Sequence, residues 1–269
     1  MLAMATKTLN FANFLSPLLQ ETYESILNYV VEHVGCTATL YTGQSLSEFT
    51  SGMADVGFIC GLQYVRMKEW PDCPVELLVA PVLEGKHYYG LPIYYSSVVV
   101  RVDRPYKSFD DLKGCVWAYN EFESHAGCNI VCSCLLERKK GPHYFGKVVR
   151  SGSHMNSLRM VLEGKVDAAA IDSHVFEIAL HRSPDLTEHV HSIDHLGPST
   201  IPPVVVAKRL DKALKERLRN ALVTMHEDEY MAKRLREGLV ERFVPITDKQ
   251  YDDIRVMYKR ARSAIFPFI

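Results

Sequence analysis

Two short polar loops in this sequence each combine a hydroxyl, an imidazole and a glycine. The first loop, SHAG at 124–127, follows the apolar run 113–119, and the second, GSH at 152–154, follows the run 146–151. In both places an apolar strand pattern gives way to a helical one. The first amides of a helix have no intrahelical acceptor and bear partial positive charge, so together with a hydroxyl and a ring N–H they can bind an anion. The two loops therefore predict an anion site.

Both loops are expected at one edge of a sheet, because ligands of open α/β sheets bind where the strands end. Gly127 would let the backbone approach the ligand closely. Each loop also has a structural interpretation, since Ser124 can simply cap the helix and a single histidine is commonly structural. The residues predicted to contact the ligand from these loops are Glu123, Ser124, His125, Gly127, Ser153 and His154.

Four further side chains are expected near the same edge, together with one carboxylate. Asp172 ends the buried run AAAID, where it can either cap the next helix or pair with a cationic group of the ligand, and the sequence leaves both open. Tyr94 and Ser96 should face one way and Tyr95 the other, because side chains alternate along a strand. Tyr64 follows a strand of the first half of the chain and is a candidate wall of the site.

Alternating strand and helix patterns position these loops. Residues 7–60 predict strand 7–11, helix 16–35, strand 37–41, helix 45–52 and strand 54–60. Residues 113–171 repeat this order with strand 113–119, helix 125–140, strand 146–151, helix 154–164 and strand 165–171. Such alternation is typical of parallel α/β sheets. Beyond residue 206 helical patterns dominate, at 210–225, 227–239 and 247–263.

A local echo indicates that the chain forms two similarly built lobes. SGMADVGFI at 51–59 and EGKVDAAAI at 163–171 share a glycine that ends a helix and an aspartate that precedes a strand. We assign residues 1–98 and 203–269 to lobe 1 and residues 99–202 to lobe 2. Two extended passages, one near 94–103 and one marked by Pro198, Pro202 and Pro203, would cross between the lobes, and such connections permit hinge motion.

Composition excludes several classes of partner. The 269 residues are 47% apolar and 23% charged with a net charge of −1, and the basic residues are scattered, so nucleic acid is not an expected partner. No run approaches the 18 apolar residues of a membrane helix, so direct membrane insertion is not expected. The N-terminus shows no secretory signal. As written, the protein is expected to be soluble and cytoplasmic, or periplasmic if an N-terminal signal was removed.

The seven cysteines favour reduced, buried thiols and a reducing compartment, because their number is odd and several lie in apolar runs. Cys128 and Cys132 lie four residues apart on a predicted helix, which raises the alternative of metal or redox chemistry. With Val131 and Leu135 they also form an apolar stripe, and their spacing matches no standard zinc pattern. The sequence contains no GxSxG motif, which would have indicated a hydrolase. We expect no metal and no cofactor.

Several segments, in this order, resemble the phosphate, phosphite and phosphonate substrate-binding proteins of ABC transporters, over about residues 8–206. The segments are LSPLLQETYESI, DVGFICGLQYV, YYSSVVVRVD, SFDDLKG, NEFESHAG, YFGKVVRSGSHMNSLRMVLEGKVDAAAID and LGPSTIPP. The resemblance implies a two-lobed type 2 periplasmic-binding-protein-like fold, the Venus-flytrap, with two crossing strands. It also implies that residues matching Ser124, His125, His154 and Tyr94 hold phosphonate oxygens. Asp172 is the nearest match to an acidic residue that receives an amino group.

The chain departs from the family pattern at Ala126, where family loops commonly carry a second serine. The predicted function is binding of a small oxyanion between two lobes, with no reaction. The partner would be an ABC-transporter permease or an unknown protein. Two alternatives stay open: an enzyme of thiamine-pyrimidine or menaquinone-precursor synthesis on the same fold, and a cytosolic sensor or carrier.

Overall fold

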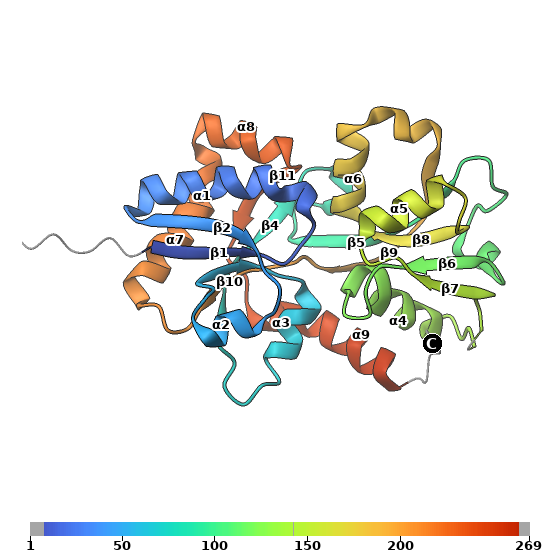
Figure 1. Cartoon of the computed structure of the whole chain (residues 1–269), viewed down its shortest axis with the longest axis horizontal. Coiled ribbons are helices and arrows are strands. Elements are labelled where there is room, and N and C mark those ends of the chain that lie inside the picture. Colours follow the sequence, from blue (N-terminus) through green and yellow to red (C-terminus); the bar gives the residue numbers. More distant parts are fainter. Residues whose placement is uncertain (1–7, 142, 264–269) are drawn as a thin grey trace, which may run out of the picture. The chain divides into compact units, whose positions relative to one another are not determined.

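The computed structural model describes residues 8–141 and 143–263 and divides the chain into two compact units. Unit 1 consists of the residues up to Pro92 together with Ile201–Tyr251, and unit 2 consists of Ile93–Thr200 together with the residues from Asp252 on. Each unit has its own mixed β-sheet with helices packed on it (Figure 1). The prediction of two α/β lobes is confirmed.

Unit 1 is built on a six-stranded sheet. Its strands are β1 (Thr8–Asn13), β2 (Thr37–Thr42), β3 (Val56–Phe58), β4 (Val75–Leu83), β10 (Val204–Ala207) and β11 (Val240–Val244). Their order is β11-β4-β10-β3-β1-β2, with β1 parallel to β2 and β3, and β4 antiparallel to β10 and β11. The helices are α1 (Gln20–Val34), α2 (Ser47–Ser51), α3 (Gly61–Met67), α7 (Lys212–Thr224) and α8 (Glu229–Glu237).

Unit 2 is built on a five-stranded sheet. Its strands are β5 (Ile93–Arg101), β6 (Val116–Tyr119), β7 (Lys147–Arg150), β8 (Ala168–Asp172) and β9 (Val190–Thr200). Their order is β7-β6-β8-β5-β9; β6 is parallel to β7 and β8, and β5 is antiparallel to β8 and β9. The helices are α4 (Ile130–Glu137), α5 (His154–Leu162), α6 (Ser173–Arg182) and α9 (Asp252–Ser263).

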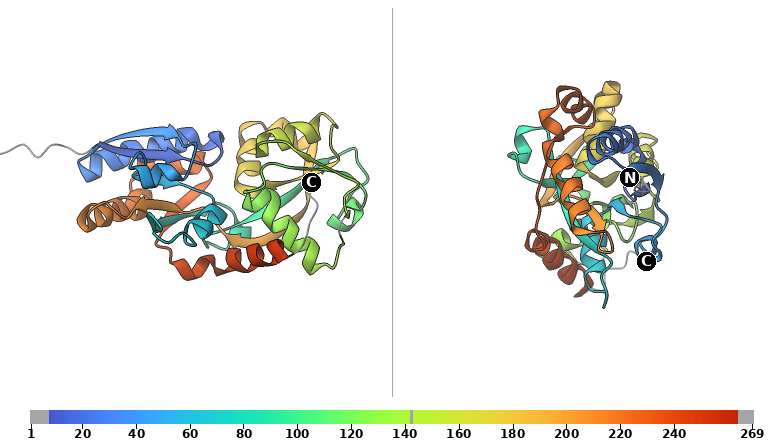
Figure 2. Two further views of the ribbon diagram at one scale, coloured as in Figure 1. Left: turned by 60° about the horizontal axis from the view of Figure 1, so that its bottom comes forward. Right: turned by 90° about the vertical axis from the view of Figure 1, so that its left-hand side faces the viewer.

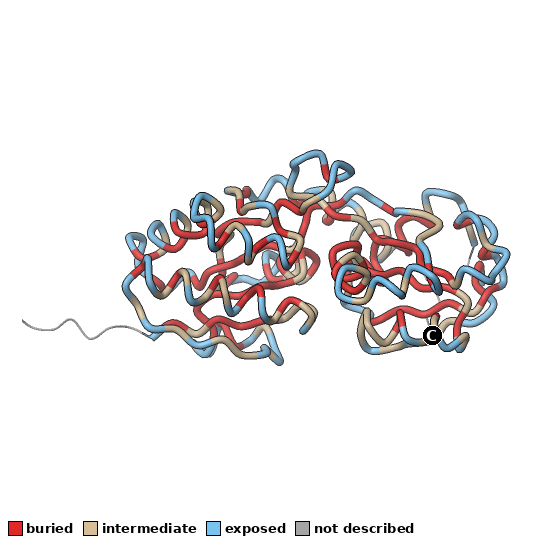
Figure 3. The backbone as a smooth tube through the Cα atoms, turned by 90° about the horizontal axis from the view of Figure 1, so that it is seen from above, coloured by how far each residue is buried: buried red, intermediate tan, exposed pale blue. Residues whose placement is uncertain are grey.

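The core of unit 2 is aromatic and lies beside β6. Trp117 stacks on Phe145 with their ring centroids 4.4 Å apart, and Phe109 meets the edge of this pair. The central strands are buried along most of their length, as Figure 3 shows. Burial on both faces of the sheet explains the apolar run AAAI before Asp172, since a strand covered on both sides has no solvent face to mark with polar residues.

The predicted helix at 125–140 has two parts. Its first turn, η4 (His125–Asn129), is π-helical, and α4 continues from Ile130. The amide of Asn129 donates to the carbonyl of Ser124, five residues earlier, over 3.1 Å. A π-helical turn is wider than an α-helical one and is frequent at functional sites. The sequence period does not reveal this widening, because a single π-helical turn is too short to establish a period of its own.

The sequence echo marks equivalent positions in the two sheets. Before β3, the carboxylate of Asp55 accepts the amide of Asn10 over 2.9 Å, and the amide of Asp55 donates to the carbonyl of Asn10 over 2.8 Å. Before β8, Asp167 makes the same two bonds to Val116, both of 2.8 Å. In each unit an aspartate thus ties its strand to the start of a parallel neighbour.

Helix α9 packs on unit 2, whereas the sequence prediction grouped residues 252–269 with lobe 1 and divided the chain at 98 and 203. Met257 and Ala261 pack against the core of unit 2, and Arg260 pairs with Glu137 of α4. Figure 2 shows α9 in red beside α4 in green. The helical period identifies the apolar stripe of α9 but cannot identify the sheet that covers it. Residues 264–269 lie outside the described residues.

Two composition-based expectations can be compared with the fold. Across residues 8–141 and 143–263, no helix combines the length and apolarity needed to cross a bilayer. All seven cysteines are free, and five of them, at 73, 115, 128, 132 and 134, are buried. The expectation of buried thiols is confirmed for these five.

Candidate functional site

The two predicted loops meet at Asn120, the first residue after β6. Its amide Nδ2 lies 3.2 Å from Nε2 of His154, the first residue of α5. A Cβ added to Gly127 in η4 would lie 1.9 Å from Oδ1 of Asn120 and 3.3 Å from Cε1 of His154. The start of η4 and the start of α5 are therefore neighbours, and only a glycine at 127 leaves room for the Asn120 side chain.

The start of α5 is organised by Ser153. Its hydroxyl accepts the amide of Asn156 over 3.1 Å, and its carbonyl accepts the amide of Ser157 over 2.9 Å. The amides of His154 and Met155 precede the first intrahelical bond, as at every helix start. They are available to an anion together with the partly exposed Ser153 hydroxyl.

The start of η4 is organised in the same way by Ser124. Its hydroxyl accepts the amide of Gly127 over 3.1 Å, which is the capping role left open by the sequence. Ser124 stays partly exposed, so its hydroxyl hydrogen can still be donated. Capping and ligand contact are compatible at this position.

His125 faces a different set of partners from His154. It has no exposed surface, and its two ring nitrogens lie 2.8 Å from Oγ of Ser199 and 2.9 Å from Nδ2 of Asn129. Burial lowers the pKa of His125 to about 3. At neutral pH the ring is therefore uncharged, and both of its nitrogens are used within unit 2.

His154 is partly exposed and also neutral. Burial lowers the pKa of its ring to about 4, against a smaller opposing effect of a hydrogen bond with the carbonyl of Ala170. The amide of Asp172 lies 3.5 Å from Nδ1. The imidazole thus joins the loop after β6 to the end of β8, and it cannot supply a positive charge at neutral pH.

Asp172 caps α6 through one carboxylate oxygen. Oδ1 accepts the amides of His174 over 2.9 Å and of Val175 over 3.3 Å. Burial raises the pKa of Asp172 to about 7, and these two amide hydrogen bonds oppose the shift. Both capping bonds go to Oδ1, and neither uses Oδ2. The two interpretations of this carboxylate, helix cap and ligand contact, therefore use different oxygens and do not compete.

The predicted residues of β5 differ in burial. Ser96 is fully buried, and its hydroxyl donates to the carbonyl of Ala126 over 2.7 Å, which fixes η4 to the sheet. Tyr94 is 1% exposed, with its ring 6.3 Å from that of His125. Tyr95 is half-buried, and its amide donates to the hydroxyl of Ser173 over 3.1 Å. Ser96 and Tyr94 are therefore buried residues of β5 that pack near η4.

The two remaining predicted residues are Glu123 and Tyr64. Glu123 is exposed in the loop before η4. Tyr64 belongs to unit 1, where it is buried in α3 and its hydroxyl donates to Oδ1 of Asp248 over 2.6 Å. Its ring lies 5.0 Å from that of Tyr251. Tyr64 thus has a structural role in unit 1 that its position in the sequence did not indicate.

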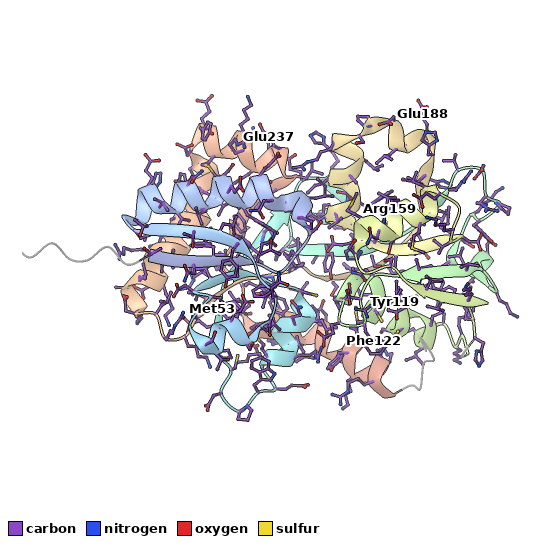
Figure 4. All side chains as sticks on the ribbon, in the orientation of Figure 1. Met53, Tyr119, Phe122, Arg159, Glu188 and Glu237 are labelled. Carbon is purple, nitrogen blue, oxygen red and sulfur yellow. The ribbon has the colours of Figure 1, made fainter. Side chains whose placement is uncertain are left out.

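Sequence analysis missed several residues of this region. Asn120 is 6% exposed and its Oδ1 has no hydrogen-bond partner within the described residues. Arg159, on α5, folds back so that Nη2 donates to Oδ1 of Asn156 over 3.1 Å, placing an exposed cation near the helix start. Figure 4 labels Arg159 on α5, and Tyr119 and the 61% exposed Phe122 around the end of β6. The polar residue that ends an apolar strand was the available signal for Asn120.

The cysteines of α4 are packed in the core of unit 2. Cys128 and Cys132 are 4% and 5% exposed, and a hydrogen bond to Cys128, followed by burial, raises the pKa of the Cys132 thiol. Among the residues that the structure describes, no three histidine, cysteine or acidic side chains are arranged to hold a metal ion. The apolar stripe predicted for this helix is confirmed.

Comparison with known proteins identifies the class. Residues 11–251 match the sequence family described as ABC transporter, phosphonate, periplasmic substrate-binding protein. Because the match covers most of the chain, the protein belongs to this family. It is a solute-binding protein of the phosphonate ABC-transporter type, and the expectation of a binding protein rather than an enzyme is confirmed by this membership.

Solved structures with the same fold agree. PhnD1 from Prochlorococcus marinus, in complex with methylphosphonate, has 16% sequence identity and a TM-score of 0.80, covering 96% of this chain and 99% of that one. A binding protein component of a phosphonate ABC transporter from Pseudomonas aeruginosa has 17% identity and a TM-score of 0.80, covering 96% and 87%. XAC2383 from Xanthomonas citri, bound to ATP, has 17% identity and a TM-score of 0.74, covering 97% and 100%. The predicted type 2 periplasmic-binding fold is confirmed.

Proposed function

We propose that this protein binds a small phosphonate or a related oxyanion at the adjoining starts of η4 and α5. The observation that carries the proposal is the contact of Gly127 and His154 around Asn120, which brings two sets of helix-start amides together. Each set bears partial positive charge, so their effects on one anion add. The hydroxyls of Ser124 and Ser153, already oriented as caps, lie at the same two helix starts.

Apart from Asp172, the predicted contact residues divide into three groups in this proposal. Ser124, Gly127, Ser153 and His154 lie around the two helix starts and supply the ligand contacts. Tyr94, Ser96 and His125 are buried and hold the loops in place. Glu123, Tyr95 and Tyr64 remain predicted contacts, with no separate support from the contacts within unit 2. Arg159 adds a positive charge that attracts anions.

Asp172 gives the site a preference among phosphonates. Its Oδ1 caps α6, and its Oδ2 is left to accept a hydrogen bond. An amino group on the ligand would supply that hydrogen and a positive charge, which also lowers the pKa of the carboxyl from its raised value. We therefore expect an aminoalkylphosphonate to bind more tightly than methylphosphonate.

The family assignment supports the further proposal that the protein delivers its ligand to the permease of an ABC transporter. Family members are described as periplasmic, so we place this protein there in preference to the cytoplasm. Ligand binding would shift a pre-existing equilibrium of conformations, as in any receptor whose closed form has the higher affinity. Fractionation of cells that express the native gene tests the location.

Isothermal titration calorimetry tests the proposed ligand class. The purified protein is titrated with methylphosphonate, 2-aminoethylphosphonate, phosphate and methanesulfonate at pH 8. We expect saturable binding of at least one phosphonate and tighter binding of 2-aminoethylphosphonate. A melting temperature unchanged by millimolar amounts of all four compounds would contradict the proposal.

The variant Asp172→Asn separates the role of the carboxylate from that of the helix cap. Asparagine keeps an oxygen for the cap but removes the negative charge. We expect the preference for 2-aminoethylphosphonate over methylphosphonate to fall about tenfold, the effect of losing about 1.4 kcal/mol. An unchanged preference would remove Asp172 from the site.

A further inference from the structure

A chain of buried hydrogen bonds leads from η4 to the last residues of β9 and the first residues of α9, all within unit 2. Nδ2 of Asn129 lies 2.9 Å from Nδ1 of His125, and Nε2 of His125 lies 2.8 Å from Oγ of Ser199. The Ser199 hydroxyl donates in turn to Oδ2 of Asp253 over 2.9 Å. His125 and Ser199 are 0% and 1% exposed, so water does not compete for these bonds.

The chemistry of the four groups gives the chain one direction. The amide nitrogen of Asn129 can only donate, so Nδ1 of His125 accepts and Nε2 bears the proton. The carboxylate of Asp253 can only accept, so Ser199 donates to it and uses a lone pair to accept from His125. Asp253 is held independently by the amides of Thr200, over 2.6 Å, and Ile254, over 2.7 Å. One tautomer of His125 is therefore selected, with its ring fixed at both nitrogens.

We propose that Ser199 and Asp253 are positioning residues for the ligand-binding turn η4, acting through His125. This inference rests on the proposed function of that turn. His125 is the first residue of η4 and follows Ser124, the residue that caps it. Fixing the His125 ring fixes the orientation of the amides that follow it, while Ser96 holds the next carbonyl, that of Ala126. Ser199 and Asp253 themselves make no ligand contact.

The place of these residues in the chain gives the positioning a second consequence. The chain leaves unit 2 after Thr200 and returns to it at Asp252, so Ser199 and Asp253 are each one residue from a boundary. A change of backbone angles at either boundary is transmitted through Ser199 and His125 to η4. By linkage, an anion that orders η4 must bias the same boundary residues equally. The hydrogen-bonded chain thus couples ligand binding to the conformation of two connections between the units.

The variants Ser199→Ala and Asp253→Asn test the positioning role. Ser133→Ala is the matched control: Ser133 is also a buried serine whose hydroxyl bonds to a residue of α9, because it accepts from Nη1 of Arg260 over 2.9 Å. Calorimetry with methylphosphonate should show affinities about tenfold weaker for Ser199→Ala and Asp253→Asn, and an affinity near that of the wild type for Ser133→Ala.

Nuclear magnetic resonance of the wild-type histidine rings provides a readout that a purely structural role would not change. We expect His125 to show only the Nε2-protonated tautomer, and its ring nitrogen shifts to move on saturation with methylphosphonate although the ring does not touch it. This measurement needs no variant to fold. In Ser199→Ala the Nε2 proton of His125 loses its acceptor while Asn129 still donates to Nδ1, so the Nε2 shift should change and the Nδ1 shift should change less.

Two outcomes would overturn the inference. The first is that Ser199→Ala and Asp253→Asn bind methylphosphonate with the same affinity as Ser133→Ala. The second is that the ring nitrogen shifts of His125 do not change when methylphosphonate is added. Wild-type protein that binds none of methylphosphonate, 2-aminoethylphosphonate or phosphate would refute the proposed function itself, and this inference with it. If the wild type binds one of these compounds and Ser199→Ala binds it with the same affinity, only the inference is refuted and the proposed function stands.

Discussion

The turns that follow β1 in unit 1 and β6 in unit 2 have similar sequences and different partners. β1 ends at the buried Asn13, and β6 is followed by the buried Asn120. In each turn a serine comes next, Ser16 or Ser124, and its hydroxyl accepts an amide of the helical turn that follows. Asn13 is satisfied locally, because Oδ1 accepts the amide of Leu15 over 2.8 Å. Asn120 instead reaches His154, in the second helical element along the chain.

This difference shows how one local pattern can either close a loop on itself or join two loops. In the turn after β1, the side chain of Asn13 bonds to Leu15 and Gln20, both within seven positions along the chain. The turn after β6 depends on α5, β5 and β9 through His154, Ser96 and Ser199. The contacts that make the second turn a candidate site are thus those that the first turn lacks.

The largest difference that we expect between the two units is in stability, when the aspartates that tie neighbouring strands, Asp55 and Asp167, are replaced. Asp55 is buried and also lies 3.1 Å from Nη2 of Arg209, whereas the nearest cation to Asp167, Arg104, is 4.0 Å away. Removing a buried, paired carboxylate leaves its partners unsatisfied. We expect Asp55→Ala to lower the free energy of unfolding by about 3 to 5 kcal/mol, and Asp167→Ala by about 1 to 3 kcal/mol.

Urea unfolding followed by circular dichroism measures both variants. If the two units unfold separately, each variant should lower the transition of its own unit and leave the other unchanged. Equal losses for the two variants would show that the ion pair with Arg209 adds nothing, and that the echo is energetically as well as geometrically symmetric.

The next largest expected effect is on ligand affinity, when the side chains that contact Asn120 and Asn13 are removed. His154 is the first residue of α5 and lies next to Asn120. Gln20 is the first residue of α1, and its Oε1 lies 3.5 Å from Nδ2 of Asn13. In His154→Ala the buried Asn120 amide loses its partner and the two helix starts are no longer joined. We expect methylphosphonate affinity to fall by a factor of about 5 to 150, corresponding to about 1 to 3 kcal/mol.

Gln20→Ala is the matched control, because it removes the equivalent partner in the turn of unit 1. Its Asn13 keeps the hydrogen bond from Leu15 and needs no second helix. Calorimetry should give an affinity within about twofold of the wild type, because the hydrogen bond that is lost is a long one of 3.5 Å within unit 1. An affinity loss in Gln20→Ala as large as in His154→Ala would contradict the division between the two turns.

The smallest effect is the pH dependence contributed by the titrating groups of the unit 2 site. The pKa values of His125 and His154 are lowered to about 3 and about 4 from 6.5, so the unfolded chain takes up protons first, and their contribution to stability is lost as the pH falls from about 6.5 to 4. The pKa of Asp172 is raised to about 7 from 3.8, so its contribution is lost as the pH rises from about 4 to 7.

The two effects oppose each other between pH 4 and 6.5, with two histidines against one carboxyl. The melting temperature of the wild type should therefore rise with pH over this interval. Asp172→Asn removes the opposing group, so the rise should become steeper in the variant. A rise of equal slope in both proteins would mean that Asp172 does not titrate in this window.

The sequence was sufficient where structure depends on neighbours in the chain. The alternation of strands and helices in the two αβ repeats and the capping role of Ser124 follow from local spacing and side-chain chemistry. So did the family, because the ordered segments carry it together. The echo around Asp55 and Asp167 pointed to equivalent strands, and both aspartates make the same bonds.

Only the tertiary structure decided which polar groups face one another. His125 and His154 look alike in sequence, yet one is committed to Ser199 and the other to Asn120. Asp253 lies 128 positions from His125, and no periodicity within a helix relates residues so far apart. Hydrogen bonding requires atoms within about 3 Å, and that proximity is created by the packing of α9, β9 and η4, which local sequence patterns do not encode.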